Sequence, residues 1–362
     1  ARLCYSAEAD KFGTATPLSK YRTLLAGTTV GGYALFGGGS YDSDAKKGEA
    51  IMDAYNASLT RTTAVSLSVA RQGLTAITLG NHALFVGGRS GNTSFGTVDV
   101  YDASLTRTTA TELSIARCDS AAAVVGSYAL FAGGRRNNGL FTMSQSAVDA
   151  YNTSLTRTTA TPLPSNAYAC AGGTVGGYAV FSGGSSMNSD STLVETIGAM
   201  EIVRAYDSSL TSSKAAPLSC PRAVHSAATI GNHLLFAGGS YDASLTRSTA
   251  VELSSAKTAL ASATVGEYAM FAGGYKGNSD AAYVATVADD GQGIVAQSGG
   301  NGWQYAATSE NIMDIIKDYD FIIDGTDNFP AKFLINDACV MAGKPFSHAG
   351  IIRFKGQLMT YV

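Results

Sequence analysis

One cationic position recurs through most of the chain, each time just before a short apolar run. It is filled by Arg22, Arg71, Arg117, Arg222 and Lys257. If the repeats surround a common channel, these side chains could form a positively charged ring at one of its mouths. The alternative is structural, with each side chain binding backbone carbonyls or an acid such as Asp99 or Asp149 and so tethering neighbouring units. We favour the structural role.

The other titratable residues do not form a recognisable reactive group. His82 and His233 stand where Tyr33 and Tyr128 stand in other repeats, so we interpret them as packed strand residues, while His225 and His348 are solitary. No His, Cys, Asp or Glu group has the spacing of a metal site. Five cysteines with irregular gaps predict free thiols. We therefore expect neither catalytic residues nor a metal in the repeats.

These residues are positioned by an internal repeat. The sequence of residues 101–117 recurs in similar form at 55–71, 151–167, 206–222 and 241–257, and in a more divergent form at 5–22. An apolar run, a glycine turn and an aliphatic-aromatic run ending in Gly-Gly follow each copy but the last, with a period of about 50 residues. We assign structural roles to the glycines of these pairs, whose second members are Gly38, Gly88, Gly134, Gly184, Gly239 and Gly274.

The pattern within each unit predicts four antiparallel strands. A short strand such as 121–125 ends in a turn whose first residue is glycine, as a type II′ hairpin requires. The chain returns along 128–131, crosses a polar loop, and continues in strands of the kind seen at 98–101 and 108–113. Four such strands in about 50 residues are typical of a propeller blade.

The glycine pairs and the aromatic residue on the third strand make the pattern similar to kelch repeats. The usual tryptophan near the fourth strand is missing, and Trp303 lies outside the repeats. We therefore expect a mainly β fold, with a kelch-like β-propeller of about six four-stranded blades over residues 1–300. The fifth blade is expected to be incomplete, lacking most of its third strand, and the N-terminal strands to complete the last blade and close the ring.

The loops after the glycine pairs differ in length and content, which favours a binding surface. They span 40–49, 89–96, 135–146, 185–198 and 275–280, and the candidate residues are Arg89, Arg135, Arg136, Ser185 and Tyr275. The expected partner is a protein or a glycan. The alternative is that these loops are solvated and that their sequences have diverged without any role in binding.

Composition limits the partners further. The net charge is −3 with 15% charged residues and no basic tract, so we expect no nucleic-acid binding. No run of 18 apolar residues and no charged-then-apolar leader occurs, so we expect no membrane association. Free cysteines and the lack of a leader favour a cytoplasmic location, although the compartment stays unknown, and we expect a monomer.

The pattern changes after a junction at 301–309. A helical spacing of apolar residues begins at Glu310, followed by a buried strand at 319–324 and a turn at 325–328. A helix with Pro330 in its first turn is predicted to run to Ala342, and strands at 346–352 and 357–362. Residues 310–362 thus predict a partial α/β, Rossmann-like fragment.

Three motifs in this fragment resemble the ThiF/MoeB/HesA family. They are 318–329 (DYDFIIDGTDNF), 334–339 (LINDAC) and 343–345 (GKP). The resemblance implies an enzyme that adenylates the C-terminus of a sulfur-carrier protein, related to ubiquitin-activating enzymes, with Asp327 as a Mg-ATP ligand. The glycine-rich nucleotide loop of that family lies upstream of these motifs, where this chain has repeats.

Without that loop a single carboxylate cannot position ATP. We therefore expect an inactive fragment that needs no cofactor, carried by a non-catalytic scaffold. The alternative is an ATP- and Mg-dependent adenylyltransferase-related protein whose propeller recruits the carrier.

Overall fold

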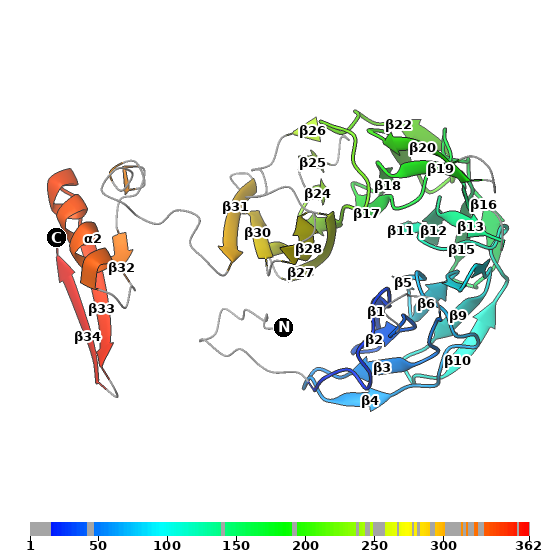
Figure 1. Cartoon of the computed structure of the whole chain (residues 1–362), viewed down its shortest axis with the longest axis horizontal. Coiled ribbons are helices and arrows are strands. Elements are labelled where there is room, and N and C mark those ends of the chain that lie inside the picture. The colour runs from blue at the N-terminus through cyan, green and yellow to red at the C-terminus, as the bar shows by residue number, and fades with distance from the viewer. Residues whose placement is uncertain are drawn as a thin grey trace. The chain divides into compact units, whose positions relative to one another are not determined.

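The computed structural model of the chain contains two compact units, 1–300 and 301–362 (Figure 1). It describes residues 16–41, 47–138, 142–189, 194–236, 239–242, 247–248, 258–265, 268–276, 279–280, 283–289, 294–300, 313, 316–317, 322–324, 329–352 and 355–361.

The first unit is a series of antiparallel sheets, and the predicted mainly β fold is confirmed. The first sheet contains β1 (Ala26–Val30), β2 (Tyr33–Gly37), β3 (Met52–Tyr55) and β4 (Arg61–Thr63). The second contains β5 (Thr75–Leu79), β6 (His82–Val86), β9 (Val98–Tyr101) and β10 (Arg107–Ala110). The third contains β11 (Ala121–Val125), β12 (Tyr128–Ala132), β15 (Val148–Asn152) and β16 (Arg157–Thr159). The fourth contains β17 (Ala171–Val175), β18 (Tyr178–Ser182), β21 (Val203–Tyr206) and β22 (Ser212–Lys214).

The fifth sheet corrects one prediction. It contains β23 (Ala227–Ile230), β24 (His233–Phe236), β25 (Gly239–Asp242) and β26 (Arg247–Ser248), so its third strand is present. Leu234 pairs with Tyr241 as Ala129 pairs with Tyr151 in the third sheet. The prediction was wrong because the strand begins at Gly239, the second glycine of the pair, and only the intervening loop is missing.

The sixth sheet corrects a second prediction, that the N-terminal strands complete it. Its main path contains β27 (Thr258–Val265), β28 (Tyr268–Lys276), β30 (Tyr283–Asp289) and β31 (Ile294–Gly300), and β29 (Ser279–Asp280) pairs with β28. The third and fourth positions were predicted for the N-terminal strands, but the chain that follows β28 fills them. Residues 5–15 of those expected strands lie outside the described residues. Gly274, expected to close the second strand, continues within β28.

Aromatic pairs join the second and third strands of the first four sheets. Phe85 and Tyr101 meet edge to face at 5.7 Å, and equivalent pairs lie at 5.7–5.9 Å in the other three sheets. Phe85 and Tyr101 pack against Leu35 and Met52 of the preceding sheet. The opposite face of the same strands, including Val98 and Val100, packs with the third sheet. The strands of the second sheet are buried on both faces because this sheet lies between the first and the third.

Successive sheets also meet along their first strands, β1, β5, β11, β17, β23 and β27. Threonine hydroxyls connect several of these strands. Thr78 Oγ1 donates to the Thr29 carbonyl, Thr229 to Thr174 and Thr264 to Thr229, at 2.5–2.8 Å. Among the described residues the series does not form a closed ring.

A second set of contacts lies just before each first strand. Leu24, Asp119, Ala169 and Val224 have positive φ angles near 55°, as does Gly73 at 61°. The N–H of Gly73 donates to the Leu24 carbonyl, and Asp119, Ala169 and Val224 each donate in turn to the preceding member. Left-handed backbone is unfavourable for non-glycine residues, so these bonds and the surrounding sheets hold it in place.

The backbone of each glycine pair of the first four sheets lies directly against a segment that connects neighbouring sheets. A Cβ on Gly133 would be 2.5 Å from the Ala167 carbonyl, and one on Gly134 would be 2.6 Å from the Cys118 carbonyl. In the first sheet the equivalent pair is Gly38 and Gly39, with φ angles of 70° and 97°. Our assignment of Gly38 as the second member was therefore one residue early, because a third glycine, Gly37, ends β2.

The turns between first and second strands are of two kinds. Gly80, Gly126 and Gly231 have positive φ angles and their successors do not, which confirms type II′ at these turns. In Gly31-Gly32 and Gly176-Gly177 both residues have positive φ angles, as in type I′ turns. Because the second residue of these turns is also glycine, it can adopt the positive φ angle that a type I′ turn requires.

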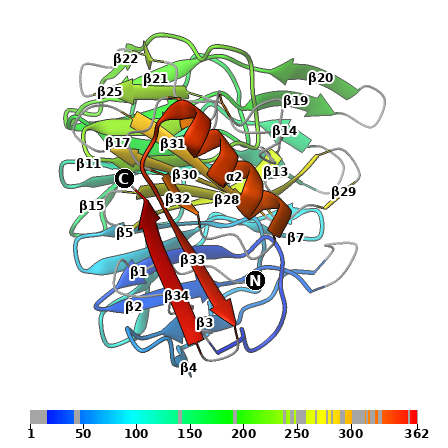
Figure 2. The ribbon, with the colours of Figure 1, turned by 90° about the vertical axis from the view of Figure 1, so that its left-hand side faces the viewer.

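The described part of the second unit includes one long helix, three strands and further helical residues at 313 and 316 (Figure 2). Strand β32 (Ile322–Asp324) pairs in parallel with β33 (Phe346–Ile352), which pairs antiparallel with β34 (Lys355–Tyr361). The predicted helix is confirmed as α2 (Phe329–Ala342), and its residues Ala338 and Cys339 pack on Ile316. The junction 301–309 lies outside the described residues. No described helix is long and apolar enough to span a membrane.

Replacing Gly134 by alanine should destabilise the protein more than the same change at Gly177. Both have positive φ angles, but a Cβ at Gly177 meets nothing within 4 Å. Gly177→Ala should cost about 1–2 kcal/mol for the backbone alone, and Gly134→Ala about 1–3 kcal/mol more for the overlap. Urea unfolding of both variants measures the difference. Equal losses would show that the connecting segment does not need the glycine.

Candidate functional site

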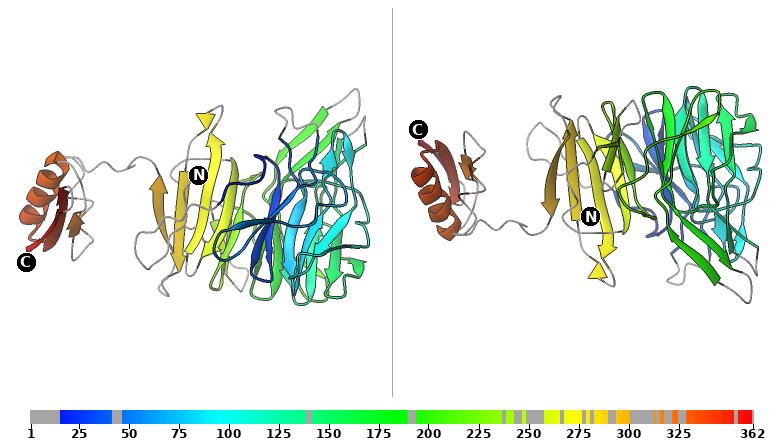
Figure 3. Two further views of the ribbon diagram at one scale, coloured as in Figure 1. Left: turned by 90° about the horizontal axis from the view of Figure 1, so that it is seen from below. Right: turned by 90° about the horizontal axis from the view of Figure 1, so that it is seen from above.

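The loops after three successive glycine pairs form a joined β-structure. The extension hairpins are β7 (Arg89–Ser90) with β8 (Thr93–Ser94), β13 (Arg135–Asn137) with β14 (Thr142–Ser144), and β19 (Ser185–Ser189) with β20 (Val194–Ala199). Strand β14 pairs with β19, and a bridge between Thr93 and Asn138 links the first two hairpins. Strands β19 and β20 extend beyond the four-stranded sheets (Figures 2 and 3).

Four of the five predicted binding residues lie on these hairpins. Arg89 begins β7, Arg135 and Arg136 lie on β13, and Ser185 begins β19. Tyr275 lies on β28 in the sixth sheet, and its side chain is outside the described residues. The structure thus brings the first four together and leaves Tyr275 apart.

Arg135 and Ser185 bind residues of the segments that precede first strands. Arg135 Nε donates to Asp119 Oδ2 at 2.6 Å, and its guanidinium lies 5.4 Å from the centre of the Tyr168 ring. Ser185 pairs its backbone with that of Tyr168, and its side chain is buried. Asp119 and Tyr168 both lie just before first strands. Arg135 and Ser185 therefore attach the hairpins to the sheets.

Arg136 is the candidate that faces solvent. It is exposed on β13 directly opposite Met143 of β14, whose side chain is 48% exposed. Arg89, by contrast, donates to the Gly91 carbonyl and stabilises the turn of its own hairpin. A flat β-surface that presents a cation beside an apolar side chain can contact a partner through both charge and apolar burial.

Three of the recurring cations, Arg22, Arg71 and Arg117, form buried ion pairs, which confirms the structural role at these positions. Arg117 Nη1 lies 2.8 Å from Asp149 Oδ2, and both side chains are fully buried. Arg117 also donates to the Ile115 and Phe131 carbonyls. Arg71 with Asp99 and Arg22 with Asp53 repeat the pairing at 2.8 and 3.0 Å. Arg222 instead binds Ser219 and Cys220, and Lys257 lies outside the described residues.

Each carboxylate has further partners. Asp149 also accepts from Arg157 at 3.0 Å and from the Ser114 N–H, which belongs to the segment arriving from the preceding sheet. Burial works to raise the pKa of Asp53. Hydrogen bonds from Ser19 and Arg61 and the Arg22 charge outweigh it and hold that pKa below its usual value. The carboxylate therefore joins a sheet to the connection that enters it.

The fourth sheet lacks every member of this network at once. Arg204 replaces the aspartate, Ala167 replaces the buried arginine, and Ser212 replaces the second arginine. Pro164 stands where Ser114 donates its N–H, and proline has no N–H to donate. A buried carboxylate there would have lost all its donors. The fifth sheet has lost the aspartate alone, since Gly239 stands in its place while Arg222, Arg247 and Ser219 remain. In the described sheets the carboxylate thus occurs only together with all its donors.

The described histidines and cysteines do not offer a reactive centre. Burial, with a smaller contribution from Arg222, lowers the pKa of His225 to about 4, and its Nε2 lies 2.9 Å from Ser182 Oγ. Burial raises the pKa of Cys118 and of Cys170 to about 12, so both stay protonated. His82 and His233 begin second strands, as interpreted from the sequence. No group that could hold a metal occurs in the described part of the chain.

Asp327, the predicted Mg-ATP ligand, lies outside the described residues. Its neighbours place the segment: β32 ends at Asp324 and α2 begins at Phe329. A connection from a parallel strand to a helix is where α/β sheets bind ligands. The role of Asp327 stays a prediction.

The comparisons with known proteins concern the two units separately. Residues 292–362 match the ThiF family. This segment is similar to the probable adenylyltransferase/sulfurtransferase MoeZ of Mycobacterium tuberculosis, with 51% identity over 51 residues, covering 14% of this chain and 13% of that protein. The sulfur carrier protein adenylyltransferase of Thermus thermophilus is 44% identical over 54 residues, covering 15% of this chain and 20% of that protein.

Both matches cover only a small part of each relative's length. The chain spans between 13% and 20% of the length of these curated proteins, so they support the predicted ThiF-type segment and leave the rest of the chain unassigned. A solved structure, titled Structure of YjhT, aligns with a TM-score of 0.55 and 12% identity over 80% of this chain and 88% of that one. At this identity the likeness shows the fold alone.

Replacing Arg117 by methionine should cost about 3–5 kcal/mol of unfolding free energy, because it leaves Asp149 buried with fewer partners. The matched control is Arg157→Met, which removes the outer, partly exposed cation and should cost about 1 kcal/mol. Urea unfolding measures both. A double variant, Arg117→Met with Asp149→Leu, should recover part of the loss. No recovery would contradict the role of the unpaired carboxylate.

Proposed function

We propose that residues 1–300 are a kelch-like β-propeller that acts as a non-catalytic binding scaffold carrying an inactive ThiF-type fragment. The repeat of four-stranded sheets, the glycine pairs and the likeness in fold to a solved structure support the propeller. The extension hairpins are the proposed contact surface, and a protein or glycan is the proposed partner.

The observation that carries the proposal is the joining of three loops into one surface. Loops that had drifted independently would not be expected to pair with one another. Here β14 pairs with β19, and the Asn137 N–H donates to Ser94 Oγ at 2.9 Å. Attachment through Arg135 and Asp119 fixes the surface to the sheets before any partner arrives, which lowers the entropic cost of binding.

A selection for peptide ligands tests the surface directly. Peptides enriched from a random displayed library on the full chain should bind the double variant Arg136→Glu/Met143→Ser at least about 10-fold more weakly. Thr109→Glu, which adds the same charge at an exposed position on β10, should leave binding unchanged. Equal binding to both variants, or no enrichment over an unrelated immobilised protein, would overturn the proposal.

A second candidate is an adenylyltransferase-related protein in which the propeller recruits a carrier protein. The match of residues 292–362 to the ThiF family favours it. ATP binding separates the two candidates. An inactive fragment should show no saturable, Mg²⁺-dependent ATP binding by calorimetry. Saturable binding lost in Asp327→Ala but kept in Asp337→Ala, a change at an exposed residue of α2, would favour the enzyme.

A further inference from the structure

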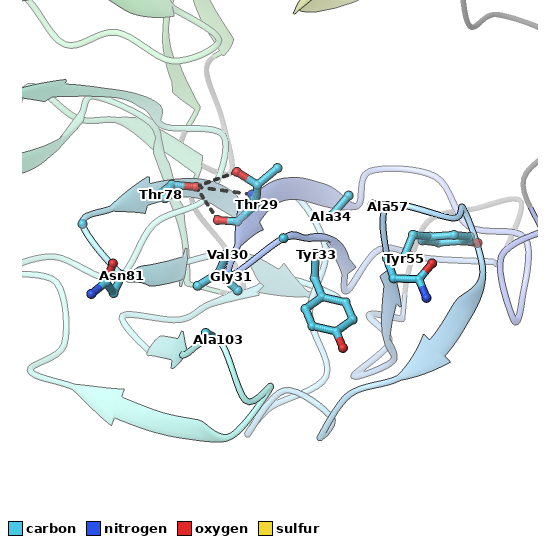
Figure 4. Close-up of a pocket in the computed structure, with 13 residues that line it drawn as sticks. Thr29, Val30, Gly31, Tyr33, Ala34, Tyr55, Ala57, Thr78, Asn81 and Ala103 are labelled. Atoms are coloured by element: carbon cyan, nitrogen blue, oxygen red, sulfur yellow. Dashed lines mark hydrogen bonds between the residues drawn. The ribbon is translucent and has the colours of Figure 1, made fainter.

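A hollow opens between the first and second sheets, at the ends of the strands opposite the glycine pairs (Figure 4). Its volume is about 480 Å³. The turn Gly31-Gly32, residues 55–57 at the end of β3, the turn Gly80-Asn81 and Ala103 form its walls. The extension hairpins follow the other ends of the same strands, so this space is separate from the proposed contact surface.

The lining combines aromatic and neutral polar groups and contains no charged side chain. Tyr33 supplies a half-buried ring, whereas the ring of Tyr55 is buried against Phe36. Figure 4 shows Tyr33 between Asn81 on one side and Tyr55 on the other. Asn56 Oδ1 accepts from the N–H groups of Ser58 and Thr60, both at 3.0 Å. The amide nitrogen of Asn56 is then the part of its side chain left to donate outward.

The turn Gly31-Gly32 leaves the space of the hollow open because its residues have no side chains. Gly31 packs so closely on Ala103 that a Cβ there would overlap the alanine side chain, which closes one wall. A Cβ on Gly32 would meet nothing within 4 Å. Asn81 and Ser127 occupy the place of Gly32 in the second and third sheets. A side chain at this place would project into the open side of the hollow.

The neighbouring sheet shows that this composition is not imposed by the repeat. In the second sheet His82 stands in the place of Tyr33, and Asp102 in the place of Asn56. Asp102 forms the same turn through Ser104 and Thr106, so the fold accepts a charge here. The first sheet instead presents a phenol ring and an amide around an open space.

We propose that this hollow binds a neutral saccharide. Sugars present apolar ring faces, which stack on tyrosine, and hydroxyl groups, which accept from amide N–H groups. Tyr33 supplies the stacking face, and Asn56 and Asn81 supply the amide groups. The absence of charge in the lining disfavours phosphorylated and acidic sugars.

Saturation-transfer NMR of the full chain with maltose, lactose and cellobiose tests the proposal. At least one should bind saturably at one site per chain, and Gly32→Asn and Tyr33→Ala should each weaken it by about 10-fold or more. Asparagine tolerates the positive φ angle, so Gly32→Asn fills the hollow without disrupting the turn. The matched controls Gly177→Asn and Tyr178→Ala change the same positions in the fourth sheet and should leave binding intact.

A free sugar and a protein-linked glycan share this chemistry. Binding of ribonuclease B but not of unglycosylated ribonuclease A would identify the linked glycan as the source, and binding of the disaccharides alone the free sugar. No saturable binding of any of these probes, or equal losses in the two pairs of variants, would overturn the proposal. Because the extension hairpins take no part, the result is independent of the peptide selection.

Discussion

The buried carboxylates of Asp53, Asp99 and Asp149 occupy the points where one sheet passes into the next. Each is surrounded by two arginines and a backbone N–H from the arriving segment. A buried charge is costly unless its partners are complete, so loss of a donor while the carboxylate remains is disfavoured. The fourth sheet, where Arg204, Ala167, Ser212 and Pro164 replace the set, shows the alternative solution.

Fixing these connections leaves the loops after the glycine pairs free to differ. The glycines allow the connecting segment to pass against the backbone, and the residues with positive φ angles bond to one another across neighbouring sheets. The chain can then leave each sheet at the same place with a different loop. Arg135 and Ser185 are the first residues of two such loops, and both remain attached to the repeated sheets.

Much of the repeat could be predicted from the sequence because its signals are local. Glycine turns and aliphatic-aromatic runs locate the first two strands of the first five sheets to within one residue. The same reasoning failed at β25, where it required a loop that the chain does without, and at β30 and β31, whose sequences no longer resemble the repeat. The role of the arginines was predictable because an acid, such as Asp149, recurs two residues before the tyrosine of the third strand.

The candidate sites were less predictable because they depend on contacts between units. Pairing of β14 with β19 requires residues from two separate loops to meet, and no signal within either loop indicates it. The hollow beside Tyr33 likewise depends on Asn81 and Ala103 from the next sheet. For the ThiF-type segment the sequence motifs carry the resemblance, whereas the position of Asp327 lies outside the described residues.

Two sets of bonds between neighbouring sheets run in one direction. The threonine hydroxyls of Thr78, Thr229 and Thr264, and the N–H groups of Gly73, Asp119, Ala169 and Val224, each donate to the unit before. A unit therefore carries its own means of attachment to its predecessor and offers the matching acceptors to its successor. Duplication of one unit would create a new junction that is already satisfied, so such a chain can lengthen or shorten by whole units as a head-to-tail polymer does.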